Sequence, residues 1–263
     1  MRLVVLSRQF NRIGYDVLET LLSSKNYQVA LTILPDYPQV GLDAGFVSNL
    51  VSRLRYSLIC LLSGAKNIKM QDSIIRLCRK HSSPLIKCND INSDSIKSKL
   101  SEIEFDMLIV AGGWPRLIGK DVIGKGRIGG MNIHPSVLPK FRGTSVHRWQ
   151  ILEGERSSGV TFHELDDMYD SGDIILQKSF NISNRETPQS LVMKASKIAS
   201  GSIEEAIRKF EQGEAISGID SREEEQWPRW NWEEDSINWL DWNLSAEEID
   251  NIVRSCNQES YHY

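Results

Sequence analysis

Three polar residues in the second half of the chain have the types needed for chemistry at a carbonyl group. Asn132 and His134 are separated by one residue, and Asp170 follows Asn132 by 38 positions. An amide can donate a hydrogen bond to an oxygen that becomes negatively charged. An imidazole titrates near neutral pH and can donate to the same oxygen, and a carboxylate can hold the protonated ring or accept a proton through water. The three residue types therefore predict a site that assists nucleophilic attack on a carbonyl carbon.

The attacking group is expected to come from outside the chain. No Ser or Cys with the features of an activated nucleophile is identifiable beside the three residues, which favours direct attack by a substrate amine or by water over a covalent enzyme intermediate. Ordinary structural roles are open as well. A histidine before a proline in a strand is commonly structural, and Asp170 has the position of a turn-forming residue. Spacing alone does not separate these interpretations.

The elements that must position these residues alternate between strands and helices. Helices are expected at 15–22, from a cap at Asp72 to Arg79, at 188–212 and at the end of the chain. The apolar run 105–111 is typical of a central parallel strand buried on both faces. An open, mostly parallel α/β sheet with helices on both faces is predicted. Its strands are expected at Leu3–Leu6, Val29–Leu34, Leu85–Lys87, Phe105–Ala111, Met131–His134, Gly159–Leu165 and Asp173–Ile182.

This sheet brings the candidate residues together. Asn132 and His134 are two apart on one strand, so their side chains share a face. Asp170 lies in the turn-rich segment 166–172 between the next two strands, where Gly172 allows the backbone to approach another molecule. Ligands of open parallel sheets gather at the carboxyl ends of the strands. We therefore expect the three residues to converge there.

Composition and charge limit the class of protein. The 263 residues are 40% hydrophobic and 25% charged, as expected of a folded globular protein. The net charge of −4 argues against a protein whose main task is to grip nucleic-acid phosphates. A catalytic domain is expected at 1–213 and a smaller C-terminal arm and helix at 214–263. The stretch 223–242 of that arm holds five of the seven tryptophans, and Ser245 with Glu248 forms a capping box for the last helix.

Cysteine usage and the amino terminus favour a cytoplasmic location. The four cysteines form no C-x-x-C pair and have no histidine at zinc-site spacing, so reduced thiols and no metal are expected. The first apolar run is too short for a signal peptide. The segment 41–64 has an apolar residue every fourth position together with Arg53 and Arg55, which predicts an amphipathic helix. Packing on the core or on a second subunit, as in a homodimer, is favoured over a membrane-surface role.

The segment Asn132-Ile-His-Pro-Ser-Val-Leu-Pro-Lys-Phe-Arg-Gly143 resembles the signature N-x-H-x-S-L-L-P-x-x-x-G of the N10-formyltetrahydrofolate-dependent formyltransferases. Gly159–His163 and Asp170–Gln177 resemble the two strands that follow this signature in the family. The resemblance covers roughly 105–213 and implies a Rossmann-like formyltransferase sheet. It also implies that N10-formyltetrahydrofolate is the formyl donor and that Asn132, His134 and Asp170 are catalytic. The pterin pocket that it implies would be lined by Trp114, Arg116, Leu117, Ile118, Asp166, Asp167, Met168 and Gly172.

Differences between this sequence and the motifs of each branch of the family indicate which amine accepts the formyl group. Glycinamide-ribonucleotide formyltransferases carry a G-x-G-S-N loop after the first strand, whereas residues 7–13 here contain no glycine. Methionyl-tRNA formyltransferases add a C-terminal domain and a basic surface, for which a chain that ends at Tyr263 with negative charge leaves little room. Segments 227–229 and 233–237 resemble the Y-P-R-x-x-P-E-D-G-x-I-D-W region of the sugar-nucleotide N-formyltransferases.

The resulting prediction is a formyltransferase that acts on the amine of a nucleotide-linked amino sugar, with no nucleic-acid or membrane partner. The tryptophan-rich arm could present aromatic faces to such a substrate, form a dimer contact or only pack on the domain. Two alternatives from other classes are a formyltetrahydrofolate hydrolase, which passes the formyl group to water, and a binding protein without turnover. The family's hydrolases carry a further amino-terminal domain, and a buried polar trio is costly to keep for packing alone. A formyltransferase for another amine is a third alternative.

Overall fold

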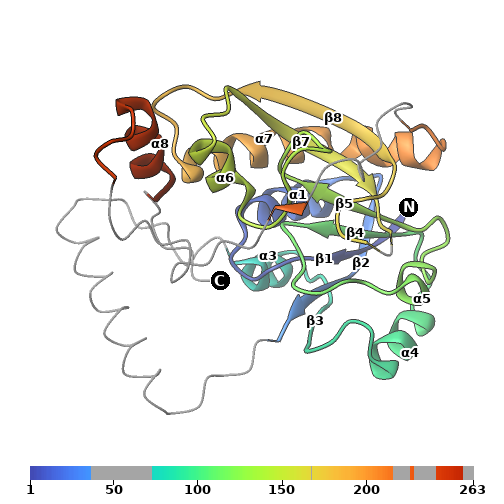
Figure 1. Ribbon diagram of the computed structural model, residues 1–263. Coiled ribbons are helices and arrows are strands. Elements are labelled where there is room, and N and C mark those ends of the chain that lie inside the picture. The colour runs from blue at the N-terminus through green and yellow to red at the C-terminus, as the bar shows by residue number, and fades with distance from the viewer. Residues whose placement is uncertain (37–72, 167, 216–225, 228–240, 257–263) are drawn as a thin grey trace, which may run out of the picture.

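The computed structural model describes residues 1–36, 73–166, 168–215, 226–227 and 241–256, and a seven-stranded sheet forms its centre (Figure 1). The strand order is β3-β2-β1-β4-β5-β7-β8; the first five strands run parallel, and β7 and β8 run antiparallel to their neighbours. The predicted open, mostly parallel Rossmann-like sheet is confirmed. Its strands are β1 (Arg2–Leu6), β2 (Gln28–Pro35), β3 (Leu85–Cys88), β4 (Met107–Ala111), β5 (Gly130–His134), β7 (Ser157–Glu164) and β8 (Ile174–Asn181).

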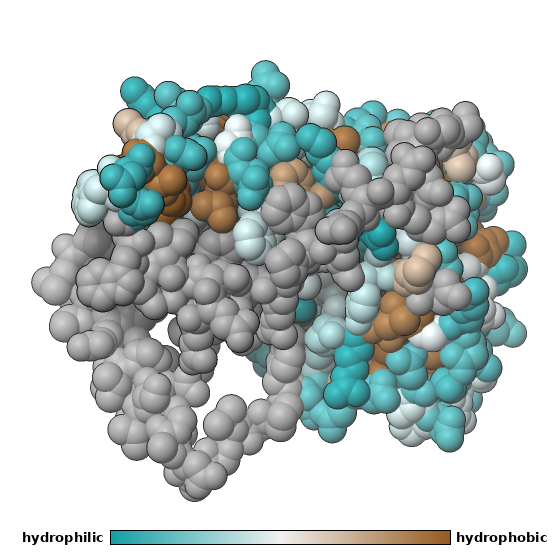
Figure 2. Space-filling view, in the orientation of Figure 1, coloured by the Kyte–Doolittle hydropathy of each residue, from teal (hydrophilic) through white to brown (hydrophobic). Residues whose placement is uncertain are grey.

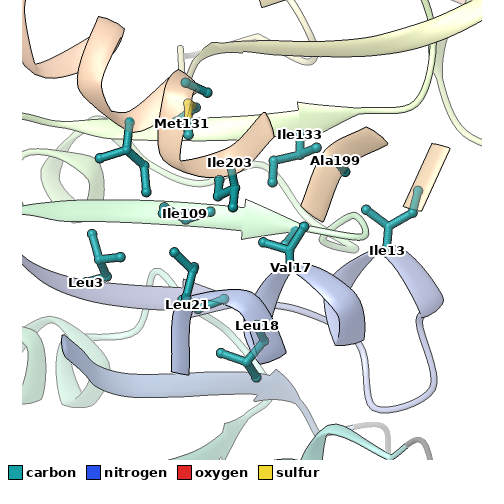
Figure 3. Packing of buried hydrophobic residues seen from close by; sticks show 14 of the residues in the cluster. Leu3, Ile13, Val17, Leu18, Leu21, Ile109, Met131, Ile133, Ala199 and Ile203 are labelled. Carbon is teal, nitrogen blue, oxygen red and sulfur yellow. The ribbon is translucent and has the colours of Figure 1, made fainter. Parts of the chain in front are cut away.

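Helices cover both faces of the sheet. One face packs against α1, α3 and α7, whose apolar side chains join those of the strands in one cluster (Figure 3). The other face packs against α4 and α5. The described helices are α1 (Arg12–Ser23), α3 (Ile74–Lys80), α4 (Asp94–Glu102), α5 (Lys120–Ile123), α6 (Val146–Leu152), α7 (Pro188–Glu211) and α8 (Ala246–Cys256).

Strand β4 shows how sequence creates these two layers. All five of its residues are buried. Because successive side chains on a strand point to opposite faces, Ile109 and Ala111 join the cluster beside α1 and α7, whereas Leu108 and Val110 join the cluster beside α4 and α5. An unbroken apolar run is the pattern that a strand buried on both faces requires.

The ends of the helices follow the predicted capping chemistry. The Thr187 side chain accepts a hydrogen bond from the Ser190 amide, and Pro188 is the first residue of α7. The Glu248 carboxylate accepts from the Ser245 amide while the Ser245 hydroxyl accepts from the Glu248 amide, so the capping box before α8 is formed. Helix α8 packs against α6, and Figure 1 shows the two helices side by side.

The apolar layer beneath α4 and α5 ends at β5. That layer draws on β1, β2 and β4, including Val110, which lies opposite Asn132 in the β4–β5 register. On the same face, β5 presents Asn132 and His134, because Met131 and Ile133 point into the other cluster. Strand β7 likewise sends Val160 and Phe162 to the other cluster and leaves Thr161 and His163 on this face. Polar side chains thus replace the hydrophobic layer over this half of the sheet.

Some expectations from sequence differ from the structure or lie beyond it. The spacing of apolar residues in the sequence did not predict helices α4, α5 and α6. Helix α4 buries only Ile96 and Leu100, and α5 and α6 span four and seven residues, which is too short for a clear apolar period. The cap proposed at Asp72, the helix expected at 41–64 and most of the tryptophan-rich stretch 223–242 lie outside the described residues.

The surface of the described residues that is visible in Figure 2 is mainly hydrophilic, and their hydrophobic side chains form small, separate patches there. Within the described ranges, the helices do not combine the length and the apolar character that crossing a bilayer requires. The apolar side chains that are exposed individually include Phe10, Leu117, Met168 and Tyr169, which follow β1, β4 and β7 in the chain.

Candidate active site

Asn132, His134 and Asp170 meet on the polar face of β5. The Asn132 Nδ2 group donates to Asp170 Oδ1 at 3.0 Å, and His134 Nδ1 lies 3.3 Å from the same oxygen. His134 is 3% exposed, and the side chain of Asp170 is 10% exposed. The structure therefore brings together the amide, the imidazole and the carboxylate that the sequence singled out.

The hydrogen bonds of His134 indicate its charge. His134 Nε2 lies 2.8 Å from the Phe141 carbonyl oxygen, which can only accept a hydrogen bond, so Nε2 carries a proton. Nδ1 faces a carboxylate, which also only accepts. Burial lowers the pKa of His134, but the charge and hydrogen bond of Asp170 and the Phe141 carbonyl outweigh it, so the net pKa is raised. Burial raises the pKa of Asp170, but the charge and hydrogen bond of His134, together with the contact of His163, outweigh it and leave this pKa well below its usual value. The two residues form an imidazolium–carboxylate pair.

The loop after β5 encloses this pair. The Gly143 amide donates to Asp170 Oδ2 at 2.8 Å, two residues beyond the carbonyl that holds His134. Phe141 and Asp170 have φ angles of 59° and 51°, in the left-handed region that non-glycine residues seldom adopt. Such conformations persist where surrounding contacts enforce them and concentrate at functional sites. The backbone of both loops is thus held in unusual geometry around the pair.

His163 is a fourth member of the site, and no pattern in the sequence singled it out as such. It lies directly opposite Asn132 in the antiparallel β5–β7 pairing, and its Nε2 is 3.0 Å from Asn132 Nδ2. His163 Nδ1 lies 2.8 Å from the Glu164 carbonyl oxygen, so Nδ1 donates there and Nε2 accepts from Asn132. The resemblance included this residue in the motif Gly159–His163, but only the strand register reveals its contact.

Replacing His163 with phenylalanine is expected to slow the reaction of the site roughly 10- to 100-fold. The change removes the acceptor for one Asn132 N–H and leaves a buried donor without a partner, a cost of about 1–3 kcal/mol. Steady-state kinetics of His163→Phe, compared with His163→Asn, which retains a polar side chain, will check this. A phenylalanine variant as fast as the wild type would show that His163 does not orient Asn132.

The residues expected to bind the folate occupy two loops on one side of the sheet. Trp114, in the loop after β4, and Leu165, in the loop after β7, both pack against the cluster beneath α4 and α5. Leu117 and Met168 are exposed apolar side chains, at 37% and 46%. Exposed apolar side chains on neighbouring loops can cover the faces of a flat heterocycle, and binding of a pterin by these residues stays a prediction.

Other members of the predicted folate set are placed differently. Arg116 is exposed, and Asp166 is half-buried. The Ile118 side chain is only 4% exposed and belongs to the hydrophobic core, so it does not offer a surface to a ligand. A Cβ at Gly172 would lie 2.1 Å from the Glu164 carbonyl oxygen, so the close approach that this glycine allows is to its own chain rather than to another molecule. Asp167 lies outside the described residues.

The mostly parallel seven-stranded sheet matches the Rossmann-like fold of the formyltransferases. The family model described as "Formyl transferase" matches residues 62–207, more than half of the chain. The chain belongs to the formyl transferase family.

Individual relatives and solved structures agree with this assignment. The methionyl-tRNA formyltransferase of Chlorobium phaeovibrioides is 31% identical over 172 residues, which cover 65% of this chain and 52% of that protein. The chain therefore spans about half the length of the curated relatives that it matches. An N-formyltransferase from Helicobacter canadensis, in complex with folinic acid and dTDP-3-aminofucose, has a TM-score of 0.66 at 18% identity, covering 97% of this chain and 80% of that chain.

A second solved structure extends the comparison to another branch. Glycinamide ribonucleotide transformylase 1 from Symbiobacterium toebii has a TM-score of 0.58 at 21% identity, covering 83% of this chain and 92% of that chain. At these identities, both structural comparisons establish the fold alone.

Proposed function

We propose that this protein transfers the formyl group of N10-formyltetrahydrofolate to the amine of an amino sugar linked to a nucleotide. The observation that carries the proposal is the convergence of Asn132, His134 and Asp170 through contacts of 3.0 and 3.3 Å in a member of the formyl transferase family. Membership supports formyl transfer. The set of side chains supports direct attack, because it holds a carboxylate to receive a proton and two donors for a developing oxyanion.

The reaction proceeds by attack of the acceptor amine on the formyl carbon. A C–N bond forms, and the formyl oxygen becomes negatively charged. The charged His134 and the Asn132 amide are the donors placed to stabilise that oxygen. The amine loses one proton towards Asp170, directly or through water. When the bond between the formyl carbon and N10 breaks, N10 takes up one proton, so the formamide and tetrahydrofolate form without net proton release.

The hydrogen bonds of the site before reaction link the proton transfer to Asp170 with the stabilisation of the oxyanion. Both Asn132 N–H groups are directed to Asp170 and His163, and both His134 N–H groups are directed to Phe141 and Asp170. A donor can therefore turn to the oxyanion only when one of its acceptors weakens. Asp170 becomes a poorer acceptor as it takes the proton of the attacking amine. The proton transfer thus releases donors as negative charge builds on the formyl oxygen.

Two findings support a sugar-nucleotide acceptor. The Helicobacter canadensis structure, whose complex contains dTDP-3-aminofucose, matches 97% of this chain. The weakly acidic chain also lacks the charge that would favour a polyanionic transfer RNA. The named relatives favour methionyl-tRNA as a second candidate acceptor. Hydrolysis of the formyl donor is a third outcome, which uses the same side chains with water as the nucleophile.

One assay separates these acceptors. The protein is incubated with N10-formyltetrahydrofolate alone, with a panel of nucleotide-linked amino sugars, or with methionyl-tRNA, and tetrahydrofolate release and acceptor mass are followed. We expect rapid release only with an amino-sugar nucleotide, which gains one formyl group. Formylation of methionyl-tRNA would instead identify that acceptor, and fast formate release without any amine would identify a hydrolase. Folate binding without turnover in every arm would contradict transferase activity.

A further inference from the structure

The short strand β6 (Arg142–Gly143) and the preceding Phe141 contact the candidate site and the residue that precedes Asp170. The Phe141 carbonyl accepts from His134 Nε2 at 2.8 Å, and the Gly143 amide donates to Asp170 Oδ2 at 2.8 Å. Between them, the Arg142 guanidinium donates to the Tyr169 carbonyl at 2.6 Å, one residue before Asp170. We call residues 141–143 the clamp segment. It holds both members of the imidazolium–carboxylate pair.

The clamp segment lies outside the main sheet. Strand β6 pairs in parallel with β9 (Gln226–Trp227) from the C-terminal arm, with Arg142 opposite Gln226 and Gly143 opposite Trp227. In the part of the chain that the structure describes, these two strands form a separate two-stranded sheet. A segment more than 80 positions later in the sequence therefore pairs with the backbone that holds His134 and Asp170.

The backbone conformation of the clamp segment is not one that an isolated peptide of this sequence would favour. Phe141 and Gly143 have φ angles of 59° and 101°, so two of its three residues lie in the left-handed region. For a non-glycine residue such a conformation costs about 1–3 kcal/mol and must be enforced by surrounding contacts. A two-residue strand supplies little rigidity alone. The contacts that support this backbone include those of the site residues, the Ser136 hydroxyl, which donates to the Phe141 carbonyl at 3.5 Å, and the pairing of β6 with β9.

From this arrangement we infer that strand β9 is a positioning element of the active site: by pairing with β6 it keeps the clamp segment against His134 and Asp170. The inference rests on the proposed function for its consequence in catalysis. A carboxylate and an imidazolium must be held within a fraction of an ångström to act in the transition state, and a 1 Å misplacement can lower the rate about 100-fold. The C-terminal arm then contributes to turnover through the backbone of β9.

The test places proline, one position at a time, in β9 of the full-length chain. Successive N–H groups on a strand point to opposite sides, so one of Gln226→Pro and Trp227→Pro must disturb the side that faces β6. Each is compared with the alanine variant at the same position, which keeps the backbone N–H and removes the same side chain. Circular dichroism and thermal unfolding monitor the fold, and turnover is measured with N10-formyltetrahydrofolate and the accepted amine.

The second measurement is the titration of His134 by NMR, assigned by the loss of its signal in His134→Gln. The charged groups beside His134 are Asp170, which raises its pKa, and Arg142, which lowers it, while burial lowers it further. Release of the clamp segment loosens Asp170, so the pKa of His134 falls towards or below its ordinary value. This measurement needs no substrate. If the wild type transfers no formyl group, the proposed function is wrong. The His134 titration then still tests whether the pairing of β9 with β6 positions the site residues.

We expect at least one proline variant to fold normally, to lose at least tenfold in kcat against its alanine partner with little change in KM, and to show a lowered His134 pKa. If both proline variants match their alanine partners in kcat and in the His134 titration, the inference is wrong. Global unfolding of both would also overturn it, because a strand that only supports β6 is not needed by the seven-stranded sheet.

Discussion

Replacing Asp170 with asparagine is expected to lower kcat for formyl transfer by about 10²- to 10⁴-fold, the range that general acid–base catalysis contributes, and to leave the fold intact. Asp170 Oδ1 receives the Asn132 amide and faces the protonated His134, and Oδ2 receives the Gly143 amide. Every one of these partners is a donor. An asparagine side chain has only one acceptor oxygen, so its NH₂ group must face a donor on one side.

The loss has two physical sources. Asparagine cannot accept the proton that the attacking amine releases. Without the carboxylate, burial also lowers the pKa of His134 unopposed by the charge that now raises it, so less imidazolium is present at neutral pH to face the oxyanion. His134→Ala removes the imidazolium itself and is expected to cost a similar factor.

Asp173→Asn provides the matched control for this experiment. Asp173 is exposed, lies three residues further along the same loop and undergoes the same chemical change. We expect it to retain most of the wild-type kcat. Single-turnover formyl transfer, with circular dichroism to verify folding, measures both variants. An Asp170→Asn variant within a few-fold of the wild-type rate would remove Asp170 from the proposed mechanism.

The second large effect concerns stability at acid pH. Burial lowers the pKa of His147 to about 4, and the nearby charge of His134 lowers it as well, while the contact with Gln150 offsets the shift only in part. Neither ring nitrogen of His147 makes a hydrogen bond of normal geometry in the described chain. Gln150 Nε2 donates to the Pro135 carbonyl, and Gln150 Oε1 accepts from the Ser158 hydroxyl. His147 is therefore buried as a neutral ring.

The sign of the effect follows from linkage. The unfolded state binds a proton at His147 near pH 6.5, whereas the folded state binds it only near pH 4. The contribution to stability is fully present above pH 6.5 and is lost as the pH falls to about 4, where the loss reaches about 3 kcal/mol. The pKa shift of His134 has the opposite effect on the free energy of unfolding and acts over a higher range of pH. Its raised pKa contributes stability that is present below pH 6.5 and is lost as the pH rises through the folded-state value.

Urea unfolding of the wild type and of His147→Phe across pH 4 to 7.5 will measure this effect. The phenylalanine variant has a ring of similar size and no titrating group, so its free energy of unfolding is expected to fall less steeply, by about 3 kcal/mol over the window. The difference between the two curves, rather than either value at one pH, is the quantity to compare. Parallel curves would mean that His147 is protonated at the same pH in both states.

Local sequence was sufficient for the order of the main elements. The apolar run that became β4, the Thr187 cap of α7 and the Ser245–Glu248 capping box are short-range patterns, and the structure contains all three. Their energetics depend on neighbours in sequence, which is why composition and spacing predicted them. Helix α6 has no such pattern. Its packing against α8 and the residues of the cluster around Ile151 depends on distant parts of the chain.

The candidate site divides in the same way. By itself, the sequence determined that Asn132 and His134 share a face, because side chains two residues apart on a strand point to the same side. Its alternation of strands and helices also placed Asp170 in the loop expected to meet them, and the resemblance gave the three residues a catalytic role. Only the tertiary structure decided that His163 faces Asn132, that residues 141–143 hold the imidazolium–carboxylate pair and that β9 pairs with β6. These contacts depend on strand register, strand direction and left-handed backbone conformations. Such features arise from chain segments that meet only on folding, so no local pattern of residue types encodes them.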